Sequence, residues 1–249
     1  MTATTTAADL RAAIPGTQVP DEVLRLLVRC TGDEKHSSAA TSPLDVEWVL
    51  YDRVLRLRPD TVDDPDRDRF LLSKGHGPAG YYAVLAAAGY LDPDLLPGFL
   101  GADSPLGGHP DRLRIPAVEA STGSLGHGLP MAVGVTLGLR ARRSTAHTYV
   151  LCGDAELGEG SNWEAAAVAV AHRLERLTCI VVDNGSRGVQ PGAIAPIFAA
   201  FGWGVVTVDG RDHDALDVAL RRRHGGRPSL VVADVTRRAD GARASGEAA

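Results

Sequence analysis

The sequence predicts an α/β fold in which a parallel sheet is flanked by helices on both faces. Short apolar runs rich in β-branched residues alternate with longer segments of helical periodicity, which is the pattern of βαβ units. The runs are continuously apolar rather than alternating, as expected for strands that are covered on both sides. With 249 residues, of which 44 % are hydrophobic, the chain is long enough for one large domain with a full core.

The chain divides into one folded domain and two loose ends. Residues 1–20 are rich in Thr, Ala, Gly and Pro, and we expect them to be flexible. The domain covers residues 21–236. Residues 237–249 (RRADGARASGEAA) have no apolar periodicity and predict a disordered tail.

Within the domain, the first half predicts helices and the second half alternates strands with helices. Ser161 and Glu164 fit a capping box, which predicts that one helix begins at Ser161. The long glycine-rich loop over 99–126 is of the kind that usually carries function. We predict helices near 21–31, 43–57, 77–89, 127–143, 161–176 and 213–223, and strands at 147–152, 178–183, 204–208 and 229–233.

Composition argues against several classes of protein. A net charge of −5 provides no basic surface for nucleic acid. No apolar run approaches the length of a membrane span, and the N-terminus lacks a signal-peptide core. The three cysteines, Cys30, Cys152 and Cys179, have no metal-binding spacing and are expected to be buried free thiols in a reducing compartment. We therefore expect a cytoplasmic protein.

An aspartate and an asparagine follow two successive predicted strands. Asp154 comes directly after the strand 147–152, and Asn184 comes after the strand 178–183. A right-handed crossover brings both to the carboxyl edge of the sheet, where open α/β sheets bind ligands. Their oxygens suit Mg²⁺, which fills the rest of its octahedron with phosphate oxygens and water. A strand-end aspartate is also a common turn or cap residue, so spacing alone leaves both interpretations open.

Four motifs then occur in an order that resembles one family. Together with the stretch around His36, they resemble the thiamine-diphosphate-binding half of the transketolases, over roughly residues 21–236. The motifs are LLSKGHGPAGYYAVLAAAGYL (71–91), GGHPDRLRIPAVEASTGSLGHGL (107–129), GDAELGEGSNWEAA (153–166) and VVDNGSR (181–187). The resemblance implies a thiamine-diphosphate-binding fold with thiamine diphosphate and Mg²⁺ as cofactors, and an enzyme whose protein part binds, orients and tunes the cofactor.

The resemblance also implies roles for individual residues. Three would bind Mg²⁺: the side chains of Asp154 and Asn184 and the backbone carbonyl of Ser186. The cofactor would be lined by His76, Gly123, Ser124, Leu125, Gly153, Asp154, Ala155, Asn184 and Ser186, with the Ala155 N–H donating to the diphosphate. Four would be catalytic: His76 near the diphosphate, His109 at the donor hydroxyls, His36 at the substrate channel, and Glu159 at the subunit interface. Imidazoles suit this work because they donate to a developing alkoxide and move protons near pH 7.

The other half of a transketolase is absent from the printed sequence. The family places its cofactor between two domains, and the second, pyrimidine-binding domain carries the activating glutamate. The resemblance therefore implies a subunit that works with a separate C-terminal subunit, in an α₂β₂ assembly, on a ketose or ketoacid donor and an aldehyde acceptor.

Two alternatives stay open, and several departures from the family favour the first of them. The family usually has glycine at Ala155, the loop after Asn184 is short, and a further histidine after the last strand has no counterpart. These favour a degenerate, non-catalytic subunit that stabilises a catalytic partner. The other alternative is the α subunit of a 2-oxoacid dehydrogenase E1 component, against which S-K-G-H and G-H-P-D argue.

Overall fold

The computed structural model describes residues 5–186 and 192–236. These residues form a five-stranded, fully parallel sheet with the strand order β1-β2-β3-β5-β4. The strands are β1 (Arg69–Leu72), β2 (Thr148–Gly153), β3 (Leu177–Asp183), β4 (Gly204–Asp209) and β5 (Ser229–Asp234). The predicted fold class is confirmed.

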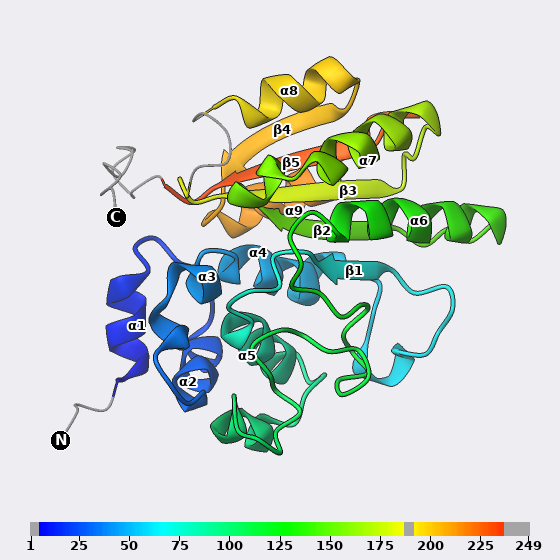
Figure 1. The fold of residues 1–249 in the computed structure, drawn as a ribbon. Coiled ribbons are helices and arrows are strands. Elements are labelled where there is room, and N and C mark those ends of the chain that lie inside the picture. Colours follow the sequence, from blue (N-terminus) through cyan, green and yellow to red (C-terminus); the bar gives the residue numbers. More distant parts are fainter. Residues whose placement is uncertain (1–4, 187–191, 237–249) are drawn as a thin grey trace.

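Helices cover both faces of the sheet (Figure 1). One face is covered by α1 (Ala7–Ala13), α2 (Asp21–Arg29), α3 (Ser38–Thr41), α4 (Leu44–Val49), α5 (Ala79–Ala87) and α9 (His213–Arg221). The other face is covered by α6 (Gly128–Ala141), α7 (Gly160–Ala171) and α8 (Ile194–Phe201). Short helical turns complete the described part: η1 (Glu34–His36), the π-helical η2 (Leu50–Val54), η3 (Pro59–Thr61), η4 (Pro93–Gly98) and η5 (Ala155–Gly158).

The strands read as continuous apolar runs because each face has its own core. On β2, Tyr149 and Leu151 belong to the cluster beneath α2, α4, α5 and α9. Val150 and Cys152, which alternate with them, pack against α6, α7 and α8. Alternate side chains of a strand point to opposite faces, so the middle of a strand in a sheet that is covered twice carries mostly apolar side chains.

Part of the segment that we expected to be flexible is packed against the domain. Thr6 and Asp9 form a capping box that begins α1. Leu10 of that helix, and Ile14 and Val19 after it, are buried in the core. The expectation of a loose N-terminus is therefore wrong for this stretch, because three well-spaced apolar residues outweigh its Thr and Gly content. The predicted disordered tail, 237–249, lies outside the described residues.

The start of the helix after β2 also differs from the prediction. The N-cap of α7 is Glu159, without a side-chain cap, and the helix begins at Gly160. The Ser161 hydroxyl instead donates to the Gly126 carbonyl at 2.7 Å. The predicted capping box is wrong because Ser161 lies inside the first turn of α7 rather than at its N-cap, and its hydroxyl bonds to the loop before α6.

Two further observations bear on the class of protein. The cysteines Cys30, Cys152 and Cys179 are free and buried, as predicted. Within the part of the chain that the structure describes, every helix is too short or too polar to cross a membrane.

Candidate functional site

The three predicted metal ligands meet at the carboxyl edge of the sheet. Strands β2 and β3 are neighbours, and the Asp154 N–H donates to the Val182 carbonyl at 3.2 Å. The Ser186 N–H donates both to Asp154 Oδ2, at 2.8 Å, and to Asn184 Oδ1, at 3.1 Å. The two side-chain oxygens therefore lie around one backbone donor, as the crossover argument predicted.

The oxygen set is of the kind that Mg²⁺ uses. Asp154 is 4 % exposed, and its Oδ1 accepts from the Ser186 hydroxyl at 2.6 Å and from the Ala155 N–H at 2.9 Å. The described residues contain no group of three or more His, Cys, Asp or Glu side chains that could hold a metal ion. One carboxylate and one amide oxygen fit a cation that takes few protein ligands and completes its shell with phosphate and water.

A second carboxylate, Glu156, ties three motifs together beneath this edge. It is 1 % exposed. Its Oε1 accepts from the Ser73 hydroxyl and, at 2.9 Å, from the Gly126 N–H, while its Oε2 accepts from the Gly153 N–H at 3.3 Å. Burial raises its pKa, against the hydrogen bonds that lower it. Glu156 thus fixes S-K-G-H, S-T-G-S-L-G and the strand end relative to one another, a role that the sequence did not reveal.

The structure brings together His76 and His109, which are 33 positions apart in the chain and belong to two different motifs. Their ring centroids are 4.6 Å apart at an interplanar angle of 78°. Burial, and then His76, lower the pKa of His109. Gly123 has a φ of +150°, and a Cβ there would lie 2.4 Å from His109 Cδ2. A glycine is therefore required for this close approach of the predicted cofactor loop to the imidazole.

The remaining predicted residues are exposed to solvent. His36 lies at the end of η1 and its Nε2 contacts Thr5 Oγ1 at 3.2 Å. Leu125 is 41 % exposed. Ser124, Ala155 and Glu159 are also exposed. The Ala155 N–H, expected to donate to a diphosphate, donates to Asp154 in this structure. Its backbone lies in a right-handed 3₁₀ turn, so a methyl group is tolerated there without strain.

A largely buried positive charge, Lys74, lies behind the site and was not predicted. The Lys74 ammonium of S-K-G-H donates to the Ala39 carbonyl at 2.7 Å, which joins the segment after His36 to this loop. Burial lowers its pKa, and Glu47, Asp154 and Glu156 oppose that shift. The chain has only two lysines. This rarity was the one sequence signal that could have pointed to Lys74.

The chain is similar to known transketolases in sequence and in structure. The family model of "Transketolase, thiamine diphosphate binding domain" matches residues 26–246. The chain is 39 % identical over 212 residues to an apulose-4-phosphate transketolase subunit from Actinobacillus succinogenes, a match that covers 81 % of this chain and 76 % of that protein. The transketolase from Leishmania mexicana superposes with a TM-score of 0.67 at 30 % identity, over 82 % of this chain and 37 % of that one.

One relative has a different kind of name. The chain is 52 % identical over 219 residues to "Ferredoxin fas2" of Rhodococcoides fascians, covering 87 % of this chain and 72 % of that protein. The three cysteines here are fewer than the four that hold a common iron–sulfur cluster. The family match, the fold and the four motifs agree with one another: the chain belongs to the transketolase family and carries its thiamine-diphosphate-binding domain.

Proposed function

We propose that this chain holds the diphosphate of thiamine diphosphate through Mg²⁺ and, with a separate pyrimidine-binding subunit, transfers a two-carbon ketol or related acyl unit. The donor would be a ketose or ketoacid and the acceptor an aldehyde. The observation that carries the proposal is the convergence of Asp154 Oδ2 and Asn184 Oδ1 on the Ser186 N–H at the carboxyl edge of the sheet. With the Ser186 carbonyl, these oxygens would supply the protein ligands of the cation.

The chain's own residues would position the reactants and move protons. When bound, thiamine diphosphate supplies the nucleophilic carbon and accepts the electron pair left by the breaking carbon–carbon bond. A lowered pKa keeps His109 neutral at pH 7, so one ring nitrogen can donate to a substrate oxygen while the other accepts. His76, whose ring contacts His109, would face the same oxygen or the diphosphate. His36 would line the approach to them.

The relatives of the chain and an exposed glutamate beside the site support a partner subunit. The Actinobacillus succinogenes relative is named as one subunit of its transketolase, and the chain covers 37 % of the Leishmania mexicana enzyme. Exposed Glu159, at the N-cap of α7, would meet the partner beside the cofactor. We infer an α₂β₂ assembly, and the free buried cysteines fit a reducing, cytoplasmic location.

A non-catalytic subunit is the second candidate. Ala155 places an exposed methyl group where the family usually has glycine, and its N–H is already bonded to Asp154. Such a subunit would form the complex but would not take up cofactor. The E1 alternative loses its support, because the family match over residues 26–246 is to transketolase.

Calorimetry of the complex distinguishes the two candidates. Thiamine diphosphate is titrated into the complex with Mg²⁺ and again with a chelator. We expect saturable binding that requires Mg²⁺, weakened roughly 100-fold or more by Asp154→Ala. Asp214→Ala, which removes an exposed carboxylate of α9, is the matched control and leaves binding unchanged. Absence of cofactor uptake at saturating Mg²⁺ would establish the non-catalytic subunit instead.

A further inference from the structure

A polar cavity of about 200 Å³ lies at the opposite edge of the sheet from the proposed cofactor site. Asp68, His147 and Arg176 each come directly before a strand, so they mark the amino ends of β1, β2 and β3. The proposed cofactor site follows the carboxyl ends of the same strands. The lining consists of Val54, Arg56, Asp68, Thr145, His147, Tyr149, Arg176, Arg221 and Arg223.

Positive charge exceeds negative charge in this cavity. Four arginines line it against one carboxylate, Asp68, which pairs with Arg56 at 2.9 Å. Arg221 pairs outside the lining with Asp217 at 2.6 Å. This leaves Arg176 and Arg223 without a carboxylate partner within residues 5–186 and 192–236.

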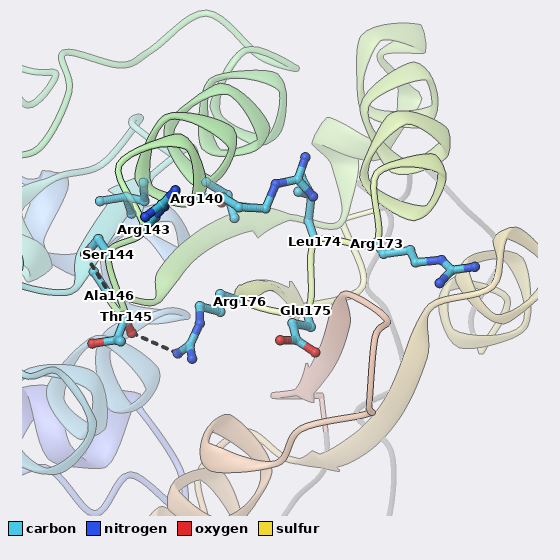
Figure 2. Close-up of a pocket in the computed structure, with 11 residues that line it drawn as sticks. Arg140, Arg143, Ser144, Thr145, Ala146, Arg173, Leu174, Glu175 and Arg176 are labelled. Carbon is cyan, nitrogen blue, oxygen red and sulfur yellow. Dashed lines mark hydrogen bonds between the residues drawn. The ribbon is translucent and has the colours of Figure 1, made fainter.

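Both unpaired arginines are held in place by neutral acceptors. Arg176 donates to the Thr145 carbonyl at 2.8 Å, as Figure 2 shows. Arg223 donates to the Leu220 carbonyl at 2.9 Å and to the Tyr149 hydroxyl at 3.0 Å, and its guanidinium lies 6.0 Å from the Tyr149 ring centroid. A guanidinium fixed by carbonyls keeps its full charge and is pre-organised to bind an anion.

A buried histidine also lines the cavity. His147 is 3 % exposed and its Nε2 lies 2.8 Å from the Thr178 hydroxyl. Burial, and then Arg223, Arg176 and Arg56, lower the pKa of His147 to about 2. Neutral His147 therefore adds no positive charge of its own to the cavity.

A neighbouring cavity extends the basic surface. It has a volume of about 280 Å³ and shares Thr145 and Arg176 with the first. Arg140 and Arg143 line it from the end of α6, while the guanidinium of Arg173 points away from the others (Figure 2). Glu175 is the one acidic residue of the lining, and it accepts from the Gly226 N–H at 3.1 Å.

We propose that the cavity between Arg176 and Arg223 is a second ligand site, which takes a phosphate-class dianion, either free phosphate or a phosphate monoester. Two guanidiniums without a carboxylate partner line the same cavity, their charge suits a dianion, and the volume accommodates a phosphate group. The site is independent of the proposed function, because it lies at the other edge of the sheet and uses none of its residues.

Phosphate titrations test the site. Inorganic phosphate is titrated into the chain by calorimetry, with a chelator present and ionic strength held constant with chloride. We expect saturable binding that Arg223→Gln or Arg176→Gln weakens by about tenfold or more, the loss of one charge-assisted bond. Arg222→Gln is the matched control: it removes the same charge from the neighbouring position, lines neither cavity, and changes affinity less than twofold.

Three further measurements make the outcome decisive. Asp154→Ala leaves phosphate binding unchanged, since a loss there would mean that phosphate occupies the cofactor site. Melting temperatures in chloride verify that each variant folds. Phenyl phosphate, titrated in parallel, assigns the ligand as monoester or free phosphate by the tighter affinity. Equal weakening by all three arginine variants, or no saturable binding, overturns the proposal.

Discussion

At the scale of single residues, a buried carboxyl group interacts with Lys74, the lysine of S-K-G-H. Glu47 of α4 is fully buried, and neither carboxylate oxygen has a hydrogen-bond partner among the described residues. Burial raises the pKa of Glu47 to about 8, and the nearby Lys74 ammonium opposes that shift. A carboxyl group in such a place is stabilised by binding a proton rather than by ionising.

This predicts a pH dependence of stability that belongs to Glu47. Its pKa is about 8 in the folded chain against 4.5 ordinarily, so the folded chain binds more protons than the unfolded chain between these values. The free energy of unfolding therefore falls as pH rises through this window. Glu47→Gln removes this titration, so the free energy of unfolding of the variant does not fall in this way. Between pH 5 and pH 8, the free energy of unfolding of the variant should therefore rise relative to that of the wild type by on the order of 3 kcal/mol.

Urea unfolding at pH 5, 6.5 and 8 measures this difference. Glu164→Gln, on the exposed side of α7, is the control, and its offset from the wild type stays constant with pH. Parallel curves for Glu47→Gln and the wild type would show that Glu47 is ionised in the folded chain at all three pH values.

Residues of the site were predictable where they lie at strand ends, and not where their partners are distant. Asp154 and Asn184 follow from one crossover, because parallel neighbours end at the same edge. Glu156 lies within the same motif, but its role depends on Ser73 and Gly126 from two other loops. Such contacts are set by tertiary packing, which a local pattern does not contain.

At the scale of elements, periodicity predicted the long elements and missed the short ones. The strands β2 to β5 lie where their β-branched runs predicted. The edge strand β1 was missed, since RFLL is four residues long and follows a charged stretch. So was α8, whose sequence IAPIFAAF contains a proline and has no polar face. The predicted helix 43–57 is α-helical only as far as Val49 and continues as the π-helical η2.

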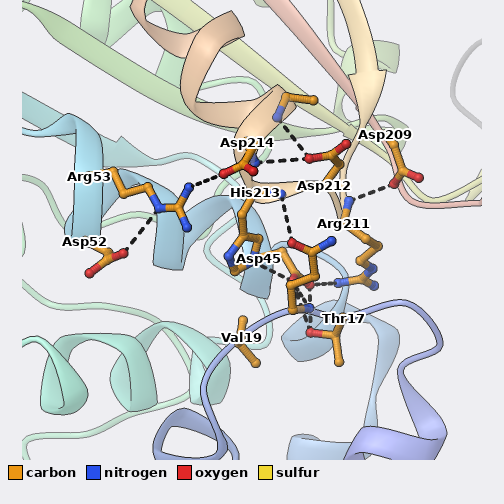
Figure 3. Close-up of polar contacts among 12 residues, drawn as sticks. Thr17, Val19, Asp45, Asp52, Arg53, Asp209, Arg211, Asp212, His213 and Asp214 are labelled. Carbon is orange, nitrogen blue, oxygen red and sulfur yellow. Dashed lines mark hydrogen bonds and ion pairs between the residues drawn. The ribbon is translucent and has the colours of Figure 1, made fainter.

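One buried polar network joins elements from both ends of the domain. Asp45 of α4 is fully buried and pairs with Arg211 at 2.6 Å and with His213 Nε2 at 2.9 Å, beside α9. It also accepts from Thr17 Oγ1 at 2.9 Å and from the Gln18 N–H at 2.8 Å, which attaches the segment after α1 (Figure 3). The N-terminal segment thus has a polar anchor in addition to its buried Leu10.

Removing the charge of Asp45 should destabilise the folded chain. Asp45→Asn leaves Arg211 buried without its counter-charge, and we expect the free energy of unfolding to fall by about 3 kcal/mol. Asp52→Asn is the matched control from the adjacent π-helix, where the exposed pair with Arg53 at 3.4 Å contributes less than about 0.5 kcal/mol. Chemical denaturation measures both, and equal losses would mean that the network adds nothing beyond a surface pair.

At the scale of the whole molecule, the two edges of the sheet have different surroundings. The carboxyl edge gathers Asp154, Asn184 and the pair of histidines, with Leu125 and Glu159 exposed beside them. The amino edge gathers the arginines of the two cavities. The sequence predicted the first edge because its motifs are local. It did not predict the second, whose arginines come from segments more than 160 residues apart, between Arg56 and Arg223.

An exposed carboxyl edge leads to the last prediction, which concerns the assembly. A site whose lining stays open to solvent cannot exclude water from the reaction, and closure of such a site strengthens its electrostatic stabilisation.

We therefore expect no ketol transfer from the isolated chain, with Mg²⁺ and thiamine diphosphate present. Adding the pyrimidine-binding subunit should restore it, with the rate saturating at an equimolar ratio. Asp154→Ala abolishes the restored rate without weakening the complex in sedimentation runs, because the carboxylate is buried and bonded to Ser186 of its own chain. Turnover by the chain alone would place a complete site within these 249 residues and exclude the two-component enzyme.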